Sequence, residues 1–166
     1  MIELKPFTSS DFEVFKSWTK TPEELFQFAG PLFTFPLNDE QLNNYLKNND
    51  LKPFKVILKE TNEVVGHCEM NFANGNYRLS RVLVGRKDLR GKKIGEQIIR
   101  ALSNKFFKNS SINQVDLNTF SWNKAAIKCY EKVGFRINPK ETTKMMVNGQ
   151  EWTRINMVLS RPSLTE

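Results

Sequence analysis

A basic, glycine-containing segment at positions 84–95 has the residue types that bind an anion. It reads Val-Gly-Arg-Lys-Asp-Leu-Arg-Gly-Lys-Lys-Ile-Gly and joins an expected strand to an expected helix. Its three glycines permit tight turns that expose backbone N–H groups, and the first turn of a helix adds N–H groups without intrahelical partners. Five Lys and Arg side chains surround them with positive charge. This combination suits a pyrophosphate.

The spacing within this segment excludes two common phosphate-binding motifs. A P-loop requires G-x-x-x-x-G-K-[ST], but one residue too many separates Gly85 from Gly91, and Lys93 occupies the Ser/Thr position. The dinucleotide-binding fingerprint G-x-G-x-x-G is absent. Taken alone, the segment is also consistent with a solvated loop that only caps a helix.

A second group of residues lies about 30 positions further along the chain. Asn123 and Tyr130 are seven residues apart, which is two helical turns, so they share one helix face with the small residue Ala126 between them. Gly134 and Phe135 follow. Considered singly, Tyr130 is typical of a half-buried packing residue and Gly134 of a helix C-terminus.

Together the two patterns resemble the GNAT superfamily of acyl-CoA-dependent N-acetyltransferases. The family's cofactor loop is [RQ]-x-x-G-x-[GA], and this chain has Arg-Gly-Lys-Lys-Ile-Gly at 90–95. The later family pattern N-x-x-A-x-x-x-Y, followed by G-F, is matched in full at 123–135. The resemblance is strongest over 64–135. One departure is Lys93, which replaces the middle glycine of the loop.

The resemblance implies that acetyl-CoA is the acyl donor and that a primary amine, on a small molecule or a protein N-terminus, attacks the thioester directly. The cofactor would lie in a V-shaped opening between strands at 77–84 and 112–117. Tyr130 would be the acid that protonates the departing thiolate, and no metal is implied. The implied cofactor-binding residues are Leu83, Val84, Gly85, Arg90, Gly91, Lys92, Lys93, Ile94, Gly95, Asn123, Ala126 and Tyr130.

A candidate general base is found on the strand that precedes 77–84, because 77–84 itself contains no acid. If Asn74-Gly75 forms a two-residue turn, Glu69 pairs with Ser80 and shares a polar face with His67, the only histidine. Partial burial would raise the pKa of the Glu69 carboxyl toward a useful range. Alternatively, Glu69 is an electrostatic partner of Arg78 or of a cationic acceptor.

The resemblance implies that the acceptor contacts the N-terminal helices and the last hairpin. The aromatic residues available there are Trp18, Phe26, Phe28, Phe33, Phe35 and Trp152. Most of them are expected to be core residues. Phe33 and Phe35, which lie in a loop flanked by prolines, are the best candidates for a pocket wall.

The pattern of elements predicts one mixed α/β domain over residues 1–166. The resemblance implies that this is an N-acetyltransferase-like domain whose central sheet is twisted and mostly antiparallel, with about seven strands, one splayed parallel pair and flanking helices. Strands are expected at 2–7, from 53, 64–72, 77–84, 112–117, 135–146 and 151–159. Helices are expected from caps near 9–11, 21, 38 and 121–123, and over 93–107.

Composition restricts the other possibilities. The chain has 166 residues, 25 Lys and Arg against 18 Asp and Glu, and a formal charge of +7, which attracts anions. Cys68 and Cys129 form no C-x-x-C pair, and neither a secretory signal nor a membrane-length apolar run occurs. We therefore predict a cytoplasmic monomer or homodimer with no membrane partner. A non-catalytic CoA-binding protein and a nucleic-acid-binding module are the alternatives; without a helix-turn-helix, RNP-like or zinc pattern, no nucleic-acid partner is expected.

Overall fold

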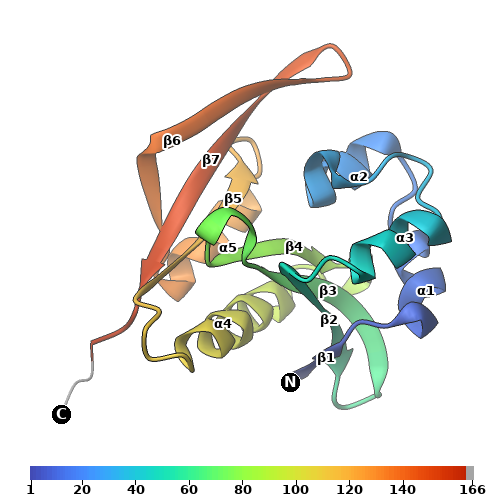
Figure 1. Ribbon diagram of the computed structural model, residues 1–166, viewed down its shortest axis with the longest axis horizontal. Helices are drawn as coiled ribbons and strands as arrows, with labels where there is room; N and C mark the ends of the chain where they lie inside the picture. Colours follow the sequence, from blue (N-terminus) through green and yellow to red (C-terminus); the bar gives the residue numbers. More distant parts are fainter. Residues whose placement is uncertain (164–166) are drawn as a thin grey trace.

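Seven strands form one sheet in the order β1-β2-β3-β4-β5-β7-β6 in the computed structural model, which describes residues 1–163 (Figure 1). The strands are β1 (Ile2–Pro6), β2 (Leu51–Leu58), β3 (Glu63–Asn71), β4 (Arg78–Val84), β5 (Gln114–Phe120), β6 (Arg136–Val147) and β7 (Gln150–Ser160). The α-helices are α1 (Phe12–Ser17), α2 (Pro22–Ala29), α3 (Asp39–Leu46), α4 (Ile94–Phe107) and α5 (Lys124–Val133).

The β4–β5 pair is parallel, and every other neighbouring pair is antiparallel. Its pairing is short: Arg78 lies opposite Asp116 and Leu79 opposite Leu117, after which no further residues pair in the described chain. The two strands therefore separate toward their C-terminal ends. The predicted fold class, a mostly antiparallel sheet with one splayed parallel pair, is confirmed.

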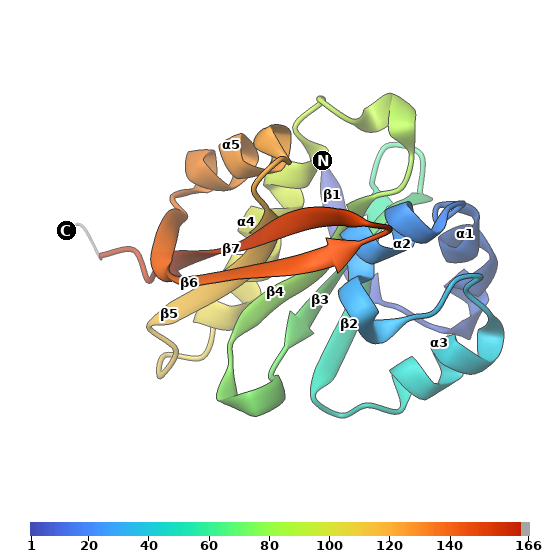
Figure 2. The same cartoon turned by 90° about the horizontal axis from the view of Figure 1, so that it is seen from above.

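The helices cover both faces of the sheet and bury two apolar clusters (Figures 1 and 2). On one face α4 packs its Ile98, Leu102 and Phe106 side chains against the strands, and α5 lies beside α4. The other face holds α1 to α3 around a separate cluster centred on Phe15 and Leu42, both fully buried. The opening between β4 and β5 therefore lies between these two layers of helices.

Local sequence explains where the helices begin. Thr21 caps α2 by accepting a hydrogen bond from the Glu24 N–H, and Pro22 occupies the first helical position. Asn38 caps α3 in the same way. These helices begin as predicted. Some strand boundaries differ from those predicted: β2 begins at Leu51 rather than at 53, and β5 extends to Phe120 rather than to 117.

The β3–β4 hairpin has the predicted register at its closed end. Asn74 and Gly75 both adopt positive φ values, 59° and 73°, and Glu69 pairs with Ser80. Beyond this pair the register shifts, so that His67 pairs with Leu83 and β4 contains one extra residue. Arg81, with φ of 48°, lies in this bulge.

The β6–β7 hairpin extends across the sheet toward the N-terminal helices (Figure 2). Near its tip, Asn148 donates a side-chain hydrogen bond to Glu23 of α2. This contact joins the tip of the hairpin to the N-terminal helices. No helix within residues 1–163 has both the length and the apolar character needed to cross a membrane.

Candidate active site

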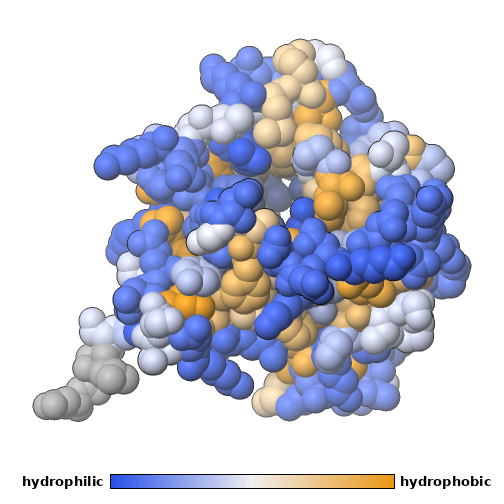
Figure 3. Space-filling view, in the orientation of Figure 1, coloured by the Kyte–Doolittle hydropathy of each residue, from blue (hydrophilic) through white to orange (hydrophobic). Residues whose placement is uncertain are grey.

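A cavity of about 760 Å³ lies where β4 and β5 separate. Its walls come from both strands, from α2, from the loop before α4 and from α5. In Figure 3 the surface is hollowed between the β6–β7 hairpin and the N-terminal helices, and both apolar and hydrophilic residues border the hollow. The volume is in the usual range for a pocket that binds a cofactor or small molecule.

The loop before α4 forms one end of this cavity through Arg90, Gly91, Lys93 and Gly95. Gly91 adopts φ of 78° and Lys93 adopts φ of 64° as the N-cap of α4. No side chain of the described residues caps this helix. Its first N–H groups therefore remain available to an anion, and they lie beside the positive charges of Arg90 and Lys93.

Not every loop residue implied by the resemblance lines the cavity. The side chain of Ile94 is buried in the main core and Lys92 is exposed outside the lining. Gly85 also lies outside the lining and has a packing function. A Cβ atom there would lie 2.1 Å from Cδ2 of Trp18, so only glycine allows the indole to pack on this backbone. Trp18 then forms part of the cavity wall.

The edge of β4 offers backbone groups to the cavity. The Gly85 N–H donates to the Val65 carbonyl at 2.9 Å, so Gly85 is bonded to β3. Because successive residues of a strand point their polar groups to opposite sides, those of Val84 point away from β3, into the cleft. The Val84 carbonyl already accepts a hydrogen bond from Arg90 Nε at 3.1 Å. Leu83 and Val84 both line the cavity.

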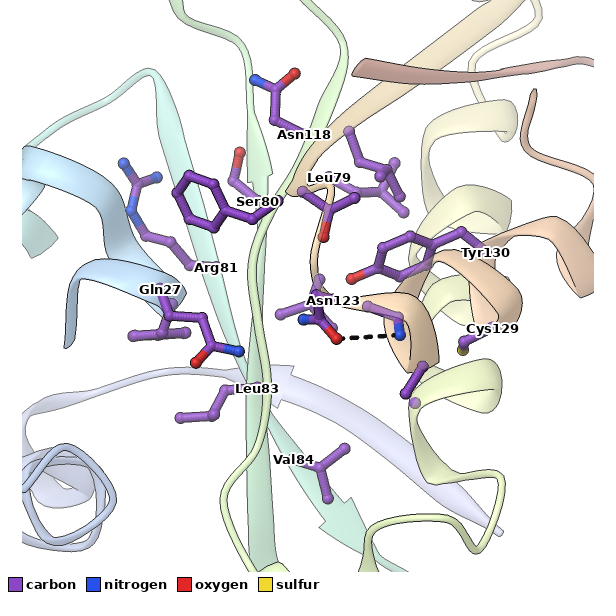
Figure 4. A pocket seen from close by; sticks show the side chains of 18 of the residues that line it. Gln27, Leu79, Ser80, Arg81, Leu83, Val84, Asn118, Asn123, Cys129 and Tyr130 are labelled. Carbon is purple, nitrogen blue, oxygen red and sulfur yellow. Dashed lines mark hydrogen bonds between the residues drawn. The ribbon is translucent and has the colours of Figure 1, made fainter. Parts of the chain in front are cut away.

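Helix α5 supplies Asn123, Ala126 and Tyr130 to the opposite wall (Figure 4). The Asn123 side-chain oxygen accepts the Ala126 N–H at 3.3 Å and so caps the helix. The Tyr130 hydroxyl points into the cavity in Figure 4. Burial raises the pKa of Tyr130, so the phenol stays protonated at neutral pH and can donate a proton.

A buried polar group lies beneath the other side of β4. The Glu69 carboxylate accepts hydrogen bonds from Arg81 Nη1 and from the Tyr45 hydroxyl, and its side chain has no exposed surface. His67 Nδ1 lies 2.8 Å from the Arg81 carbonyl, so this nitrogen carries the hydrogen, since a carbonyl can only accept. We name Tyr45, His67, Glu69 and Arg81 the buried tetrad.

Burial sets the ionisation of the buried tetrad. Desolvation raises the pKa of Glu69, and the neighbouring Arg81 guanidinium opposes this shift. Desolvation also lowers the pKa of His67 to about 4, so the imidazole is neutral near pH 7. Arg81 reaches the cavity lining, whereas His67 and Glu69 do not.

Two expectations about neighbouring residues are wrong. Arg78 is not the partner of Glu69, because its guanidinium donates two hydrogen bonds, of 3.0 and 2.8 Å, to Asp116 of β5. Phe33 and Phe35 do not line the main cavity. Phe33 is buried in the N-terminal cluster, and both residues border a smaller cavity of about 290 Å³. Phe33 completes the apolar cluster of the short helices α1 to α3, whereas Phe35 is exposed.

The aromatic residues of the main cavity come from other positions. Trp18, Phe26 and Phe28, which were expected to be mostly core residues, contribute from the N-terminal segment, and Phe120 contributes from β5. The sequence analysis missed Gln27, Arg81 and Arg154, which also line the cavity. The sequence offers one signal for these three residues, which is that each lies on a predicted element near the expected acceptor.

Replacing Lys93 with Gly should stabilise the protein. A lysine at φ of 64° pays a steric cost of about 1–2 kcal/mol that glycine avoids, partly offset by the greater freedom of glycine in the unfolded chain. We therefore expect a gain of about 1 kcal/mol and a higher Tm. Lys92→Gly is the matched control, since Lys92 has no positive φ. An unchanged Tm for Lys93→Gly would show that position 93 is not strained.

The same variant separates two functions of Lys93. If the ammonium group contacts a phosphate, Lys93→Gly weakens CoA binding but leaves binding of a pantetheine fragment unchanged. If neither affinity changes, the side chain points to solvent when the ligand is bound. Calorimetric titration of both ligands measures this difference.

No group of three or more His, Cys, Asp and Glu side chains within residues 1–163 is arranged to hold a metal ion. The cavity presents backbone N–H groups and cationic side chains at the loop end, and the protonated Tyr130 hydroxyl at the junction of the strands. Such a set can bind a phosphorylated ligand at one end and donate a proton at the junction of the strands.

Comparison with solved structures finds the same fold. A domain from Methanocaldococcus jannaschii DSM 2661 matches with 24% identity over 96% of this chain and 99% of that chain, with a TM-score of 0.69. Spermidine N-acetyltransferase from Vibrio cholerae, in complex with CoA and spermine, matches with 16% identity over 96% and 95%, and a TM-score of 0.76. An aminoglycoside acetyltransferase, AAC(6')-Ib, in complex with coenzyme A and kanamycin, matches with 20% identity over 97% and 95%, and a TM-score of 0.73.

The sequence itself also matches a known family. The model of the acetyltransferase (GNAT) domain covers residues 2–136, which include the loop before α4, the separating strands and Tyr130. The chain therefore belongs to the GNAT acetyltransferase domain family.

Proposed function

We propose that this protein is an acetyl-CoA-dependent N-acetyltransferase that acetylates a primary amine, and that residues 1–166 act as one domain for this reaction. The observation that carries the proposal is the continuous cavity between β4 and β5, which joins the anion-binding end at 90–95 to the hydroxyl of Tyr130. Solved structures of similar fold that contain CoA support it.

The residues of the cavity fit a CoA ligand. The first-turn N–H groups of α4, with Arg90 and Lys93, suit a pyrophosphate. The polar groups of Val84 on the open edge of β4 suit the amide groups of a pantetheine arm, which could bond to it as an added strand does. Asn123 uses its oxygen as a cap but keeps its side-chain NH₂ for a ligand or a water.

Acetyl-CoA would supply an acetyl thioester at the junction of the strands. The cavity walls hold the acceptor so that its amine nitrogen bonds to the carbonyl carbon while the carbon–sulfur bond breaks. Tyr130 donates its hydroxyl proton to the departing thiolate, and the proton of the amine leaves to water. Tyr130 then recovers a proton from solvent.

We assign Glu69 a positioning function rather than the base function that was one of the two alternatives from the sequence. Its carboxylate is fully buried, is hydrogen-bonded to Arg81 and Tyr45, and does not line the cavity. Its pairing instead holds Arg81 at the cavity wall.

The two free thiols, Cys68 and Cys129, are consistent with a reducing cytoplasm, and that location stays a prediction.

Acetyl-CoA should stabilise the folded protein. At 100 times its Kd a ligand of the native state adds about 2.7 kcal/mol, which raises Tm by several degrees in a chain of this size. Thermal unfolding with acetyl-CoA, with sodium chloride at the same ionic strength as the control for non-specific ion effects, measures the effect. Absence of both a Tm shift and calorimetric heat would contradict the proposal. Stabilisation without acetylation of any amine would favour the non-catalytic CoA-binding alternative.

A further inference from the structure

The acceptor side of the cavity, on the face covered by α1 to α3, is lined by arginines. Arg78, Arg81 and Arg154 all contribute to this wall. The carboxylates that line the whole cavity are Glu24 and Glu96. Glu96 pairs with Arg100 at 3.0 Å, and Glu24 pairs with Lys87 at 3.9 Å. The described lining therefore offers no unpaired carboxylate to a cationic acceptor.

Arg154 differs from the other two arginines because its charge is not balanced. Arg78 is paired with Asp116, and Arg81 is paired with Glu69. Arg154 has no ion pair and no side-chain hydrogen bond with any residue in 1–163, although it is only partly exposed. A guanidinium group in this state can bind a carboxylate with two parallel hydrogen bonds.

The surroundings of Arg154 complete a small subsite. In the sheet Arg154 of β7 lies opposite Phe120 of β5. The Phe120 ring packs within 6.2 Å of Phe26 and 4.8 Å of Trp152, measured between ring centroids. Asn118 also lines the cavity. An apolar wall beside an unpaired guanidinium suits a short organic molecule that carries a carboxylate.

The same charges affect the amine of the acceptor. A polyamine would bring several ammonium groups to a wall that has no unpaired carboxylate among its described residues, and the repulsion would weaken its binding. Nearby positive charge also lowers the pKa of a bound ammonium group, which favours the neutral amine that attacks the thioester. This effect supplies a nucleophile without a carboxylate base on the wall.

We propose that the acceptor is an amine that also carries a carboxylate, and that Arg154 binds this carboxylate. The proposal rests on the N-acetyltransferase function proposed above and names its substrate class. Free amino acids and acidic peptide N-termini share this chemistry, so the experiment must separate these two sources. It must also separate them from polycationic amines such as spermidine and kanamycin.

The test measures kcat/KM at saturating acetyl-CoA for matched pairs of amines. One arm compares the L-amino acids with their C-terminal amides, and another compares Met-Asp with Met-Asn peptide amides. Spermidine and kanamycin form the third arm. We expect the carboxylate-bearing member of at least one pair to be preferred by about 10- to 100-fold, the value of a charged hydrogen-bonded contact. The arm in which the preference occurs identifies the source.

Arg154→Met should remove this preference by lowering kcat/KM for the carboxylate-bearing amine 10- to 100-fold, chiefly through KM, while its amide is unaffected. Arg136→Met is the matched control, because Arg136 is an exposed arginine of β6 outside the cavity lining. Faster turnover of spermidine or kanamycin than of every carboxylate-bearing amine, or an unchanged preference in Arg154→Met, would overturn the proposal and leave the N-acetyltransferase function intact.

A binding measurement keeps the two proposals distinct if no amine is acetylated. Ligand-detected NMR of the CoA-loaded protein follows the same amines without turnover. Binding of carboxylate-bearing amines that Arg154→Met abolishes would support the subsite even though the catalytic function had failed. Binding that is equal in both proteins, or no binding of these amines, would overturn it.

Discussion

Replacing Tyr130 with Phe should lower kcat about 10²–10⁴-fold, the usual effect of losing a general acid, with little change in KM for acetyl-CoA. The ring would still pack beside Phe135, whose centroid lies 6.4 Å away, so the fold and the cofactor wall should be kept. Only the proton donor at the cavity would be lost. Steady-state kinetics with the best acceptor from the substrate panel measures the change.

Tyr77→Phe is the control for this experiment, because Tyr77 is 42% exposed and lies outside the cavity lining. It should leave kcat unchanged. Because burial raises the pKa of Tyr130, the rate should not fall on the alkaline side through ionisation of this group near pH 8–10, where an ordinary tyrosine begins to lose its proton. An unchanged kcat in Tyr130→Phe would reduce this residue to a packing function.

Replacing Glu69 with Gln should cost about 3–5 kcal/mol of unfolding free energy, because Arg81 would keep a largely buried charge without its counter-ion. Tm should fall by about 10 °C or more. The glutamine keeps the shape and can still accept a hydrogen bond from Tyr45. Urea unfolding of the wild type and the variant measures the difference.

A double variant and a pH profile test the positioning function of Glu69. Glu69→Gln combined with Arg81→Met removes both charges and should be more stable than Glu69→Gln alone. If Glu69 positions Arg81, the acidic limb of the kcat–pH profile keeps its place in Glu69→Gln. A shifted acidic limb together with a lower kcat would restore Glu69 as the base and contradict our assignment.

The sequence was most informative where glycine and capping residues constrain the backbone. Asn74 and Gly75 determined the register of the β3–β4 turn, and so the pairing of Glu69 with Ser80 was predicted correctly. The loop before α4 was placed through its family pattern. Lys93, which replaces the middle glycine of the family pattern, has the left-handed conformation that glycine favours.

The bulge in β4 could not be predicted. In so short a strand, one extra residue does not visibly change the alternation of apolar and polar residues. Arg81 therefore looked like an ordinary strand residue, and its pairing with Glu69 was missed. The packing of Trp18 on Gly85 was also invisible, since it joins positions 67 residues apart in the chain. Long-range contacts of this kind follow from the fold and not from local pattern.

The two apolar clusters on opposite faces of the sheet give the two ends of the proposed site separate structural supports. The residues that would grip the donor depend on α4 and its cluster, whereas Phe26 and Phe28 belong to the segment built around Phe15. A change of side chain among α1 to α3 can therefore reshape the acceptor wall while the loop at 90–95 keeps its support. Such an arrangement allows acceptor preference to change through substitutions in one layer, without any substitution in the layer that supports the proposed donor site.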